Sequence, residues 1–285
     1  MPIQNVNYTL EVYNKAALNG DSEAQFKLGV IYEKGLGVTA NPAEAIKWYR
    51  LAAENNNLGG QVNLGAMYKN GSGVKRDFAE ALKWYKMAAN KGDPLAQYNL
   101  GRMYEEGCGI AKDINNAIIW YKMAVAKKFS PAKVNLGRLY KKGQGLARNY
   151  IKAVRLFREA AQEGDPRGQY NLGIMYKKGL GIKANEREAI KWYRNAAEQG
   201  HLAAQVNLGS MHENGSGVIY DLGKALKWYS AAANQNSAAG QFSLGSLYEK
   251  GKGVKADREK AIKLYQMSAK QGFPYAREAL ERLGQ

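Results

Sequence analysis

Cysteine is almost absent from this sequence of 285 residues, since Cys108 is the only one. A single cysteine excludes an intramolecular disulfide and a thiolate metal cluster. Histidine is also scarce, because only His201 and His212 occur, and neither has Cys, His or carboxylate neighbours at metal-ligand spacing. No nucleophile, base and orienting residue can be grouped into a catalytic set. The sequence therefore predicts no metal, no cofactor and no enzymatic activity.

Long apolar runs and acidic residues are also few. No run approaches the ~18 apolar residues that span a bilayer, and residues 1–10 lack the basic start and apolar stretch of a secretory signal. We expect a cytoplasmic protein, or a secreted or periplasmic one if its signal is missing from this sequence. With 25 acidic residues against 42 basic ones, the formal net charge is +17. This excess favours an anionic partner.

An internal repeat dominates the sequence. A Leu-Gly pair returns every 36 residues without insertion or deletion, at Leu28, Leu64, Leu100, Leu136, Leu172, Leu208 and Leu244. A fixed period of this size is typical of stacked repeats, in which each unit packs on its neighbours and the ends need caps. We expect an N-terminal capping helix at 1–23, seven repeats over 24–275 and a C-terminal capping half-repeat at 276–285. Repeats 1 to 7 are 24–59, 60–95, 96–131, 132–167, 168–203, 204–239 and 240–275.

Each repeat is predicted to hold two helices. Helix A of repeat 1 carries Ala24, Leu28, Ile31 and Tyr32 in an apolar stripe of helical period. Gly29 interrupts that stripe at a cost of ~1 kcal/mol relative to alanine, so its recurrence predicts a close approach of the next helix. Helix B follows an Asn or Asp that is suited to an N-cap. These residues are Asn41, Asp77, Asp113, Asn149, Asn185, Asp221 and Asp257.

Smaller motifs receive structural interpretations. Glu44, Glu80 and Glu188 stand three residues after an N-cap residue and favour a capping box. The Gly-x-Gly loops between helices A and B are interpreted as turns with positive φ, because a phosphate loop follows a strand and is usually single. His201 occupies a helix start where other repeats have Asp or Ser, which predicts a capping role.

The consensus of the repeats carries a family resemblance. Repeat 2 shows it in full, with Ala66, Tyr68, Gly71, Gly73, Asp77, Ala81, Trp84, Tyr85, Ala88 and Ala89. This pattern strongly resembles the Sel1-like repeat family, which is related to tetratricopeptide repeats, and the resemblance covers about residues 24–275. It implies an all-α fold, a right-handed superhelical α/α solenoid of helix-turn-helix repeats. It also implies a non-enzymatic protein–protein interaction scaffold, of the kind that serves in protein quality control, in signalling and in bacterial contact with host cells.

The partner-binding residues are predicted by analogy with tetratricopeptide solenoids, in which helix A lines the concave surface. The positions two before, two after and five after Leu28 would then face inward. Repeat 4 is the most basic, with nine basic and three acidic residues. We expect an acidic, partly apolar protein or peptide to bind across repeats 3 to 5. The predicted contacts are Tyr98, Arg102, Val134, Arg138, Lys141, Arg167, Tyr170 and Lys177.

A different class of function remains open at this point. The basic surface could bind nucleic acid or anionic lipid, with the steep salt dependence of such binding. The sequence has no nucleic-acid-reading motif and no amphipathic membrane helix outside the repeats. We therefore expect nucleic acid to bind only non-specifically, and we favour a monomer.

Overall fold

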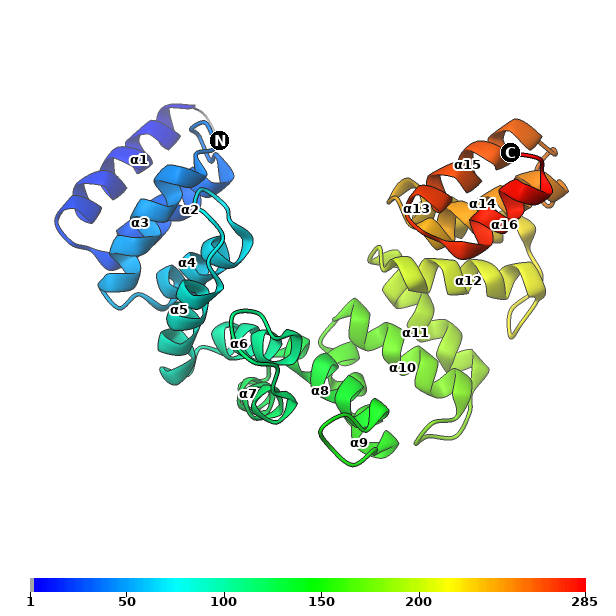
Figure 1. The fold of residues 1–285 in the computed structure, drawn as a ribbon, viewed down its shortest axis with the longest axis horizontal. Coiled ribbons are helices and arrows are strands. Elements are labelled where there is room, and N and C mark those ends of the chain that lie inside the picture. The colour runs from blue at the N-terminus through cyan, green and yellow to red at the C-terminus, as the bar shows by residue number, and fades with distance from the viewer. Residues whose placement is uncertain (1–2) are drawn as a thin grey trace. The chain divides into compact units, whose positions relative to one another are not determined.

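The structure, a computed structural model, describes the backbone of residues 3–285 and the side chains of residues 10–285. Over residues 3–285 the chain forms sixteen α-helices and no strand (Figure 1), which confirms the all-α prediction. Helices of type A are α2 (Ser22–Lys34), α4 (Leu58–Asn70), α6 (Pro94–Glu106), α8 (Ser130–Lys142), α10 (Pro166–Lys178), α12 (Leu202–Asn214), α14 (Ala238–Lys250) and α16 (Pro274–Arg282). Helices of type B are α1 (Ile3–Leu18), α3 (Pro42–Glu54), α5 (Phe78–Asn90), α7 (Ile114–Ala126), α9 (Tyr150–Gln162), α11 (Glu186–Glu198), α13 (Leu222–Asn234) and α15 (Arg258–Lys270).

The chain folds as two compact units, residues 1–132 and residues 133–285. In the N-terminal unit, each helix from α1 to α7 packs on the next one, and α2 also contacts α4. In the C-terminal unit the same holds from α9 to α16, and α12 also contacts α14. Packing between successive helices is the arrangement of a repeat solenoid. No helix within residues 3–285 is both long enough and apolar enough to cross a membrane.

The predicted N-caps are confirmed. In repeat 2, Oδ1 of Asp77 accepts hydrogen bonds from the backbone N–H groups of Ala79 and Glu80, at 2.9 and 3.0 Å. The equivalent Asn or Asp caps helix B in the other six repeats. His201 caps α12, because its Nδ1 accepts the N–H of Ala204 at 3.2 Å. Helix B of each repeat, like α12, thus begins at a residue whose side chain satisfies first-turn donors, whereas Phe273 at the start of α16 makes no such hydrogen bond.

The predicted capping boxes do not form. A capping box needs the backbone N–H of the N-cap residue, but in repeat 2 the N–H of Asp77 donates to the carbonyl oxygen of Tyr68 at 2.9 Å. The carboxylate of Glu80 instead accepts from the indole N–H of Trp84 at 3.0 Å. The N–H groups of Asn41 and Asn185 are taken by Tyr32 and Tyr176 in the same way, and Glu44 and Glu188 pair with Lys47 and Trp192.

The glycines allow two close approaches. A Cβ on Gly101 of α6 would lie 2.8 Å from the ring of Tyr121 on α7, so only glycine lets the buried tyrosine pack there. This confirms the predicted approach of helix B. In the loop of repeat 3, Gly109 has a φ of +71°, and a Cβ there would lie 2.9 Å from the backbone carbonyl carbon of Phe78. The second loop glycine therefore lets the loop rest on the first residue of helix B in the preceding repeat, and the same approach occurs at Gly73, Gly181, Gly217 and Gly253.

A ladder of buried polar side chains joins the repeats. The amide nitrogen of Gln169 donates to the backbone oxygen of Ala161 at 3.3 Å, and its amide oxygen accepts from Gln199, thirty residues later, at 2.9 Å. Repeat 4 replaces this pair by charges, since Lys133 lies 2.6 Å from Glu163. The Lys133 side chain is 5% exposed. The pairs with the same thirty-residue spacing are Gln25–Asn55, Gln205–Gln235 and Gln241–Gln271.

The first helix packs as the sequence predicts. Ala17 of α1 is buried against Ala24 and Leu28 of α2, while Leu10 and Tyr13 are partly buried beside them. In this way α1 covers the first repeat. The division into caps at 1–23 and 276–285 stays a prediction.

Candidate protein-binding face

The side chains that vary between repeats occupy one face of helix A, at the positions of Phe26, Val30 and Glu33 in repeat 1. These positions are four and three residues apart, so they share one side of the helix, which we call the helix A face. At the third position, four repeats have a glutamate that accepts a hydrogen bond from the buried tyrosine hydroxyl of helix B. The pairs are Tyr49–Glu33 (2.5 Å), Tyr121–Glu105 (2.8 Å), Tyr229–Glu213 (3.0 Å) and Tyr265–Glu249 (2.6 Å).

Repeats 2, 4 and 5 carry lysine at this third position instead, namely Lys69, Lys141 and Lys177. Repeat 4 has also exchanged its tyrosine for Phe157, so that neither the hydroxyl donor nor the carboxylate acceptor is present. The ammonium group of Lys141 lies 5.9 Å from the centre of the Phe157 ring. Where four repeats have a hydrogen-bonded glutamate at the third position of the helix A face, repeat 4 therefore has a lysine cation.

Lys141 is surrounded by further positive charge. Burial lowers the pKa of Lys141 below its usual value of 10.5, and the nearby cations Lys142, Lys178 and Arg138 lower this pKa further. We call these four residues the Lys141 cluster. The ammonium group donates to Oδ1 of Asn171 at 3.4 Å. The lowered pKa of Lys141 therefore reflects burial first and repulsion by these cations second, and an incoming anion would offset both.

Within the C-terminal unit, the structure brings only part of the predicted set together. Arg138 and Lys141 belong to one cluster, whereas Lys177 is exposed on α10. The guanidinium group of Arg167 donates two hydrogen bonds to Asp165, at 3.2 and 2.8 Å, so an acid already compensates its charge. Val134 is 5% exposed and packs in the core around α9. It offers almost no surface to a partner.

Tyr170 is the aromatic residue of the predicted set in this unit. Its ring stacks on the imidazole of His201, with ring centres 4.6 Å apart, and packs on Tyr193 at 5.7 Å. The side chain remains partly exposed on α10. Tyr170 is therefore a fixed aromatic surface with one open side.

The two remaining predicted residues lie in the N-terminal unit. The Tyr98 ring packs between Tyr121 and Phe129, with ring centres 6.0 and 5.5 Å away. Nε of Arg102 donates to Glu106, one turn later, at 3.0 Å. An intrahelical acid thus compensates the positive charge of Arg102.

The predicted set omits three residues of the site. Lys142 and Lys178 are the second members of the Lys-Lys pairs that end α8 and α10. Asn171 links the repeats, since it accepts from Lys141 and donates to the backbone oxygen of Arg167 at 2.8 Å. The sequence signal for both lysines is the paired charge in the last turn of helix A. Among the side chains of residues 10–285, no group of three or more His, Cys, Asp or Glu could hold a metal ion.

Repeated helix pairs with a constant core and one variable face define an α-solenoid of helix-turn-helix repeats. Comparison with known families agrees, because the Sel1 repeat matches residues 22–57, 59–93, 94–129, 130–165, 166–201, 202–237 and 238–273. The chain belongs to the Sel1 repeat family. Proteins of this family are commonly protein-interaction scaffolds and are generally non-enzymatic.

Solved structures show the same likeness. A Sel1 repeat protein from Oxalobacter formigenes is 30% identical with a TM-score of 0.75, and the match covers 99% of this chain and 82% of that one. The protein c5321, described as a protective antigen present in uropathogenic Escherichia coli strains, is 37% identical with a TM-score of 0.72. That match covers 95% of this chain and 58% of c5321.

A curated relative matches over a single repeat length. The DAP3-binding cell death enhancer 1 of Rattus norvegicus is 62% identical over 34 residues. These residues are 12% of this chain and 7% of the rat protein.

Proposed function

We propose that the chain is a non-enzymatic scaffold that binds an acidic, partly apolar segment of another protein on the helix A face of its C-terminal unit. The Lys141 cluster is the observation that carries this proposal. Arg138, Lys141 and Lys178 would attract carboxylates, and the exposed Lys177 would add charge. Tyr170 would supply the apolar contact. Val134 is not part of the proposed surface because it is buried.

The energetic role of the cations follows from their exposure. Charges on a partly exposed surface accelerate association and select partners more than they add affinity. The apolar contact at Tyr170 would supply affinity that persists when salt screens the charges. This difference separates the proposal from non-specific binding of polyanions, whose affinity falls steeply and linearly with the logarithm of salt concentration. The contacts expected at Tyr98 and Arg102 stay predictions for the N-terminal unit.

Reversing two charges of the cluster tests the proposal. We expect Arg138→Glu/Lys141→Glu to lower the affinity for peptides that combine acidic and aromatic or aliphatic residues by about tenfold or more, since two attractions become repulsions. An array of such peptides, with composition-matched scrambled peptides beside them, would be probed at near-physiological and at elevated salt. Peptides that bind at both salt concentrations would then be measured in solution by fluorescence anisotropy.

The matched control is Lys183→Glu/Arg187→Glu. It makes the same change in net charge at two exposed residues of the same unit, outside the cluster. We expect this control to keep most of the affinity. Equal losses in both double variants, or binding of single-stranded DNA and anionic vesicles alone with complete loss at high salt, would favour the polyanion alternative.

The lowered pKa of Lys141 predicts a pH dependence of peptide binding. The acidic peptide binds the protonated lysine, so affinity is full below the pKa of Lys141 in the unbound protein and falls as the pH rises through it. Because this pKa lies below 10.5, the fall begins at a lower pH than for an ordinary lysine. Peptide carboxylates, with pKa values near 4, stay ionised throughout.

The control for this pH dependence is Lys141→Arg, because a guanidinium group stays protonated up to a pH of about 12. We expect its affinity to change less between neutrality and a pH of about 10 than that of the unaltered protein. Anisotropy titrations across this range measure both. Identical pH profiles for the two proteins would show that Lys141 does not contact the acidic peptide.

The proposal extends to a role in bacterial contact with host cells or in signalling. The likeness to c5321, described as a protective antigen of uropathogenic strains, supports the first of these. Identification of a peptide that binds the Lys141 cluster would supply the sequence with which to search host and bacterial proteins for the partner.

A further inference from the structure

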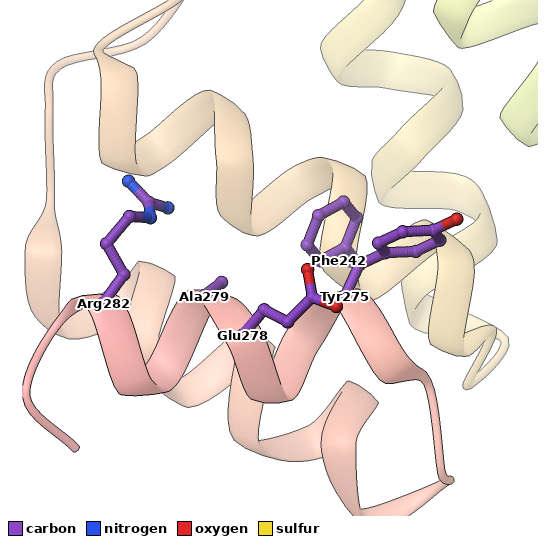
Figure 2. A pocket seen from close by; sticks show the side chains of 5 residues that line it. All are labelled: Phe242, Tyr275, Glu278, Ala279 and Arg282. Carbon is purple, nitrogen blue, oxygen red and sulfur yellow. The ribbon is translucent and has the colours of Figure 1, made fainter.

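A second, separate site lies at the end of the C-terminal unit. Phe242 of α14 and four residues of α16, namely Tyr275, Glu278, Ala279 and Arg282, line a hollow of about 300 Å³ (Figure 2). This volume is at the lower end of the roughly 300–1,000 Å³ of ligand pockets, and it suits one side chain of a partner. Phe242 occupies the first position of the helix A face, so the hollow continues that face beyond repeat 7.

Aromatic packing fixes the walls of the hollow. The ring centre of Phe242 lies 5.5 Å from Tyr265, 5.3 Å from Phe273 and 6.2 Å from Tyr275. The rings of Phe273 and Tyr275 meet edge to face at 5.6 Å. Tyr275 nevertheless remains 59% exposed. The rings are therefore held in place while one side of the aromatic wall stays open.

The two charged residues of the hollow differ, because one of them is already paired with another side chain and the other is not. Arg282 donates hydrogen bonds to Glu249 at 2.6 and 3.0 Å, and Glu249 also accepts the hydroxyl of Tyr265. Arg282 is thus balanced by an acid outside the hollow. Glu278 is exposed, and no hydrogen bond or ion pair joins its carboxylate to another of residues 10–285.

The charged groups of Glu278 and Arg282 also lie at different ends of the hollow. In Figure 2 the carboxylate of Glu278 is drawn toward the end of the hollow where Phe242 and Tyr275 lie, whereas the guanidinium group of Arg282 is at the other end. Two aromatic rings and a carboxylate at one end of a hollow favour a cation over an anion there. The ring faces attract positive charge through their quadrupoles, and the carboxylate adds direct attraction.

We infer that this hollow binds a basic side chain, lysine or arginine, of a partner protein. The aliphatic stem of such a side chain would pack on Phe242 and Tyr275, and its charged end would reach Glu278. An acidic side chain would meet the Glu278 carboxylate, and an uncharged aliphatic one would leave that carboxylate unpaired. The site shares no residue with the Lys141 cluster, so this inference does not depend on the function proposed above.

Blocked amino acids test the charge requirement directly. The N-acetyl methylamides of lysine, arginine, norleucine and glutamate would be titrated into the protein, with the ring resonances of Phe242 and Tyr275 followed by NMR. We expect saturable shifts with lysine, arginine or both, and little change with norleucine or glutamate. Lysine alone would indicate a compact ammonium site, and arginine a guanidinium that stacks on the rings. Equal shifts with norleucine, stronger shifts with glutamate or no shifts at all would overturn the inference.

Variants of α16 identify the groups responsible. We expect Glu278→Gln to weaken binding about threefold and Tyr275→Ala to weaken it about 3- to 10-fold, whereas Tyr275→Phe keeps the ring and the affinity. The matched control is Glu281→Gln, which removes the same charge from an exposed residue of α16 outside the hollow. Circular dichroism verifies that each variant is folded. Equal affinity in the Glu278 and Glu281 variants would contradict the role of Glu278.

Discussion

Raising the pH above about 10 is expected to unfold the chain, because its buried tyrosines must then ionise. Burial raises the pKa of each of these tyrosines far above the usual 10.0, and in three of them a neighbouring glutamate raises it further. The five that are most strongly affected are Tyr49, Tyr85, Tyr193, Tyr229 and Tyr265.

The sign and size of this effect follow from linkage between ionisation and folding. A pKa raised in the folded state means that the neutral hydroxyl is favoured there. The stabilisation is complete below 10.0, where the unfolded tyrosine is also neutral, and is lost as the pH rises through the folded pKa. Each tyrosine contributes a loss of about 1.4 kcal/mol per pH unit, and five contribute about 7 kcal/mol per pH unit. Since domains are stable by roughly 5–15 kcal/mol, unfolding should follow within about two pH units.

Tyrosinate absorbance and far-ultraviolet circular dichroism, recorded together, measure this transition. The absorbance of the buried tyrosines should rise only where helicity is lost. We expect Tyr85→Phe to move the midpoint to higher pH, since it removes one ionising group and Phe157 shows that the position accepts a phenyl ring. Tyr275→Phe, at an exposed residue, should leave the midpoint in place. Full tyrosinate absorbance in a chain that is still helical would refute the prediction.

Leaving Lys133 without its two acids should cost about 2–3 kcal/mol of unfolding free energy, at or just below the lower end of the cost of breaking a fully buried ion pair, because the two glutamates are partly exposed. The Lys133 side chain is 5% exposed and lies 3.3 Å from Glu159 and 2.6 Å from Glu163. In Glu159→Ala/Glu163→Ala the ammonium group stays buried without a counter-ion. Both glutamates lie at the C-terminal end of α9, where acids are unfavourable to the helix dipole. The loss would therefore come from Lys133 and not from the helix.

The matched control exchanges charges for amides. Lys133→Gln/Glu163→Gln recreates the pair that Gln169 and Gln199 form in repeat 5, so we expect a loss of less than about 1 kcal/mol. Urea unfolding followed by circular dichroism gives both free energies. If the two double variants lost equal stability, the loss of unfolding free energy would reflect altered packing between these helices and not a buried ammonium group without a counter-ion.

The fold could be predicted from the sequence because its signals are local or periodic. Asp77 caps helix B by accepting hydrogen bonds from the backbone N–H groups two and three residues later. The glycine at the position of Gly101 recurs in each repeat because the tyrosine or phenylalanine ring of helix B packs against it. The capping box of Glu80 failed for a non-local reason, since the amide it needs is taken by Tyr68 from the preceding helix. Spacing within one helix cannot reveal a competitor in another.

The candidate site was only partly predictable. Arg102 and Arg167 have acids four residues after and two residues before them in the sequence, and this spacing could have shown that their charges are compensated. Val134 and Tyr170 share one repeat position, but the short valine side chain stays in the core while the tyrosine reaches the surface. Position within a repeat therefore predicts the face but not the exposure, since Val206 at the same position is partly exposed although Val134 is buried.

The pairs of side chains that lie thirty residues apart also determine where the array can be shortened without separating a side chain from its partner. Excising 36 residues between the two helices of a repeat, from 150 to 185, would join α8 to α11 and place Lys133 opposite Gln199, a lysine without its glutamate. Excising residues 166–201 would instead remove helices α10 and α11 and leave Lys133 with Glu163. Loss or duplication of a module is thus tolerated best when the cut follows helix B. The 36-residue segment that can be removed or duplicated here therefore begins with helix A and ends after helix B, so that both members of each pair stay together.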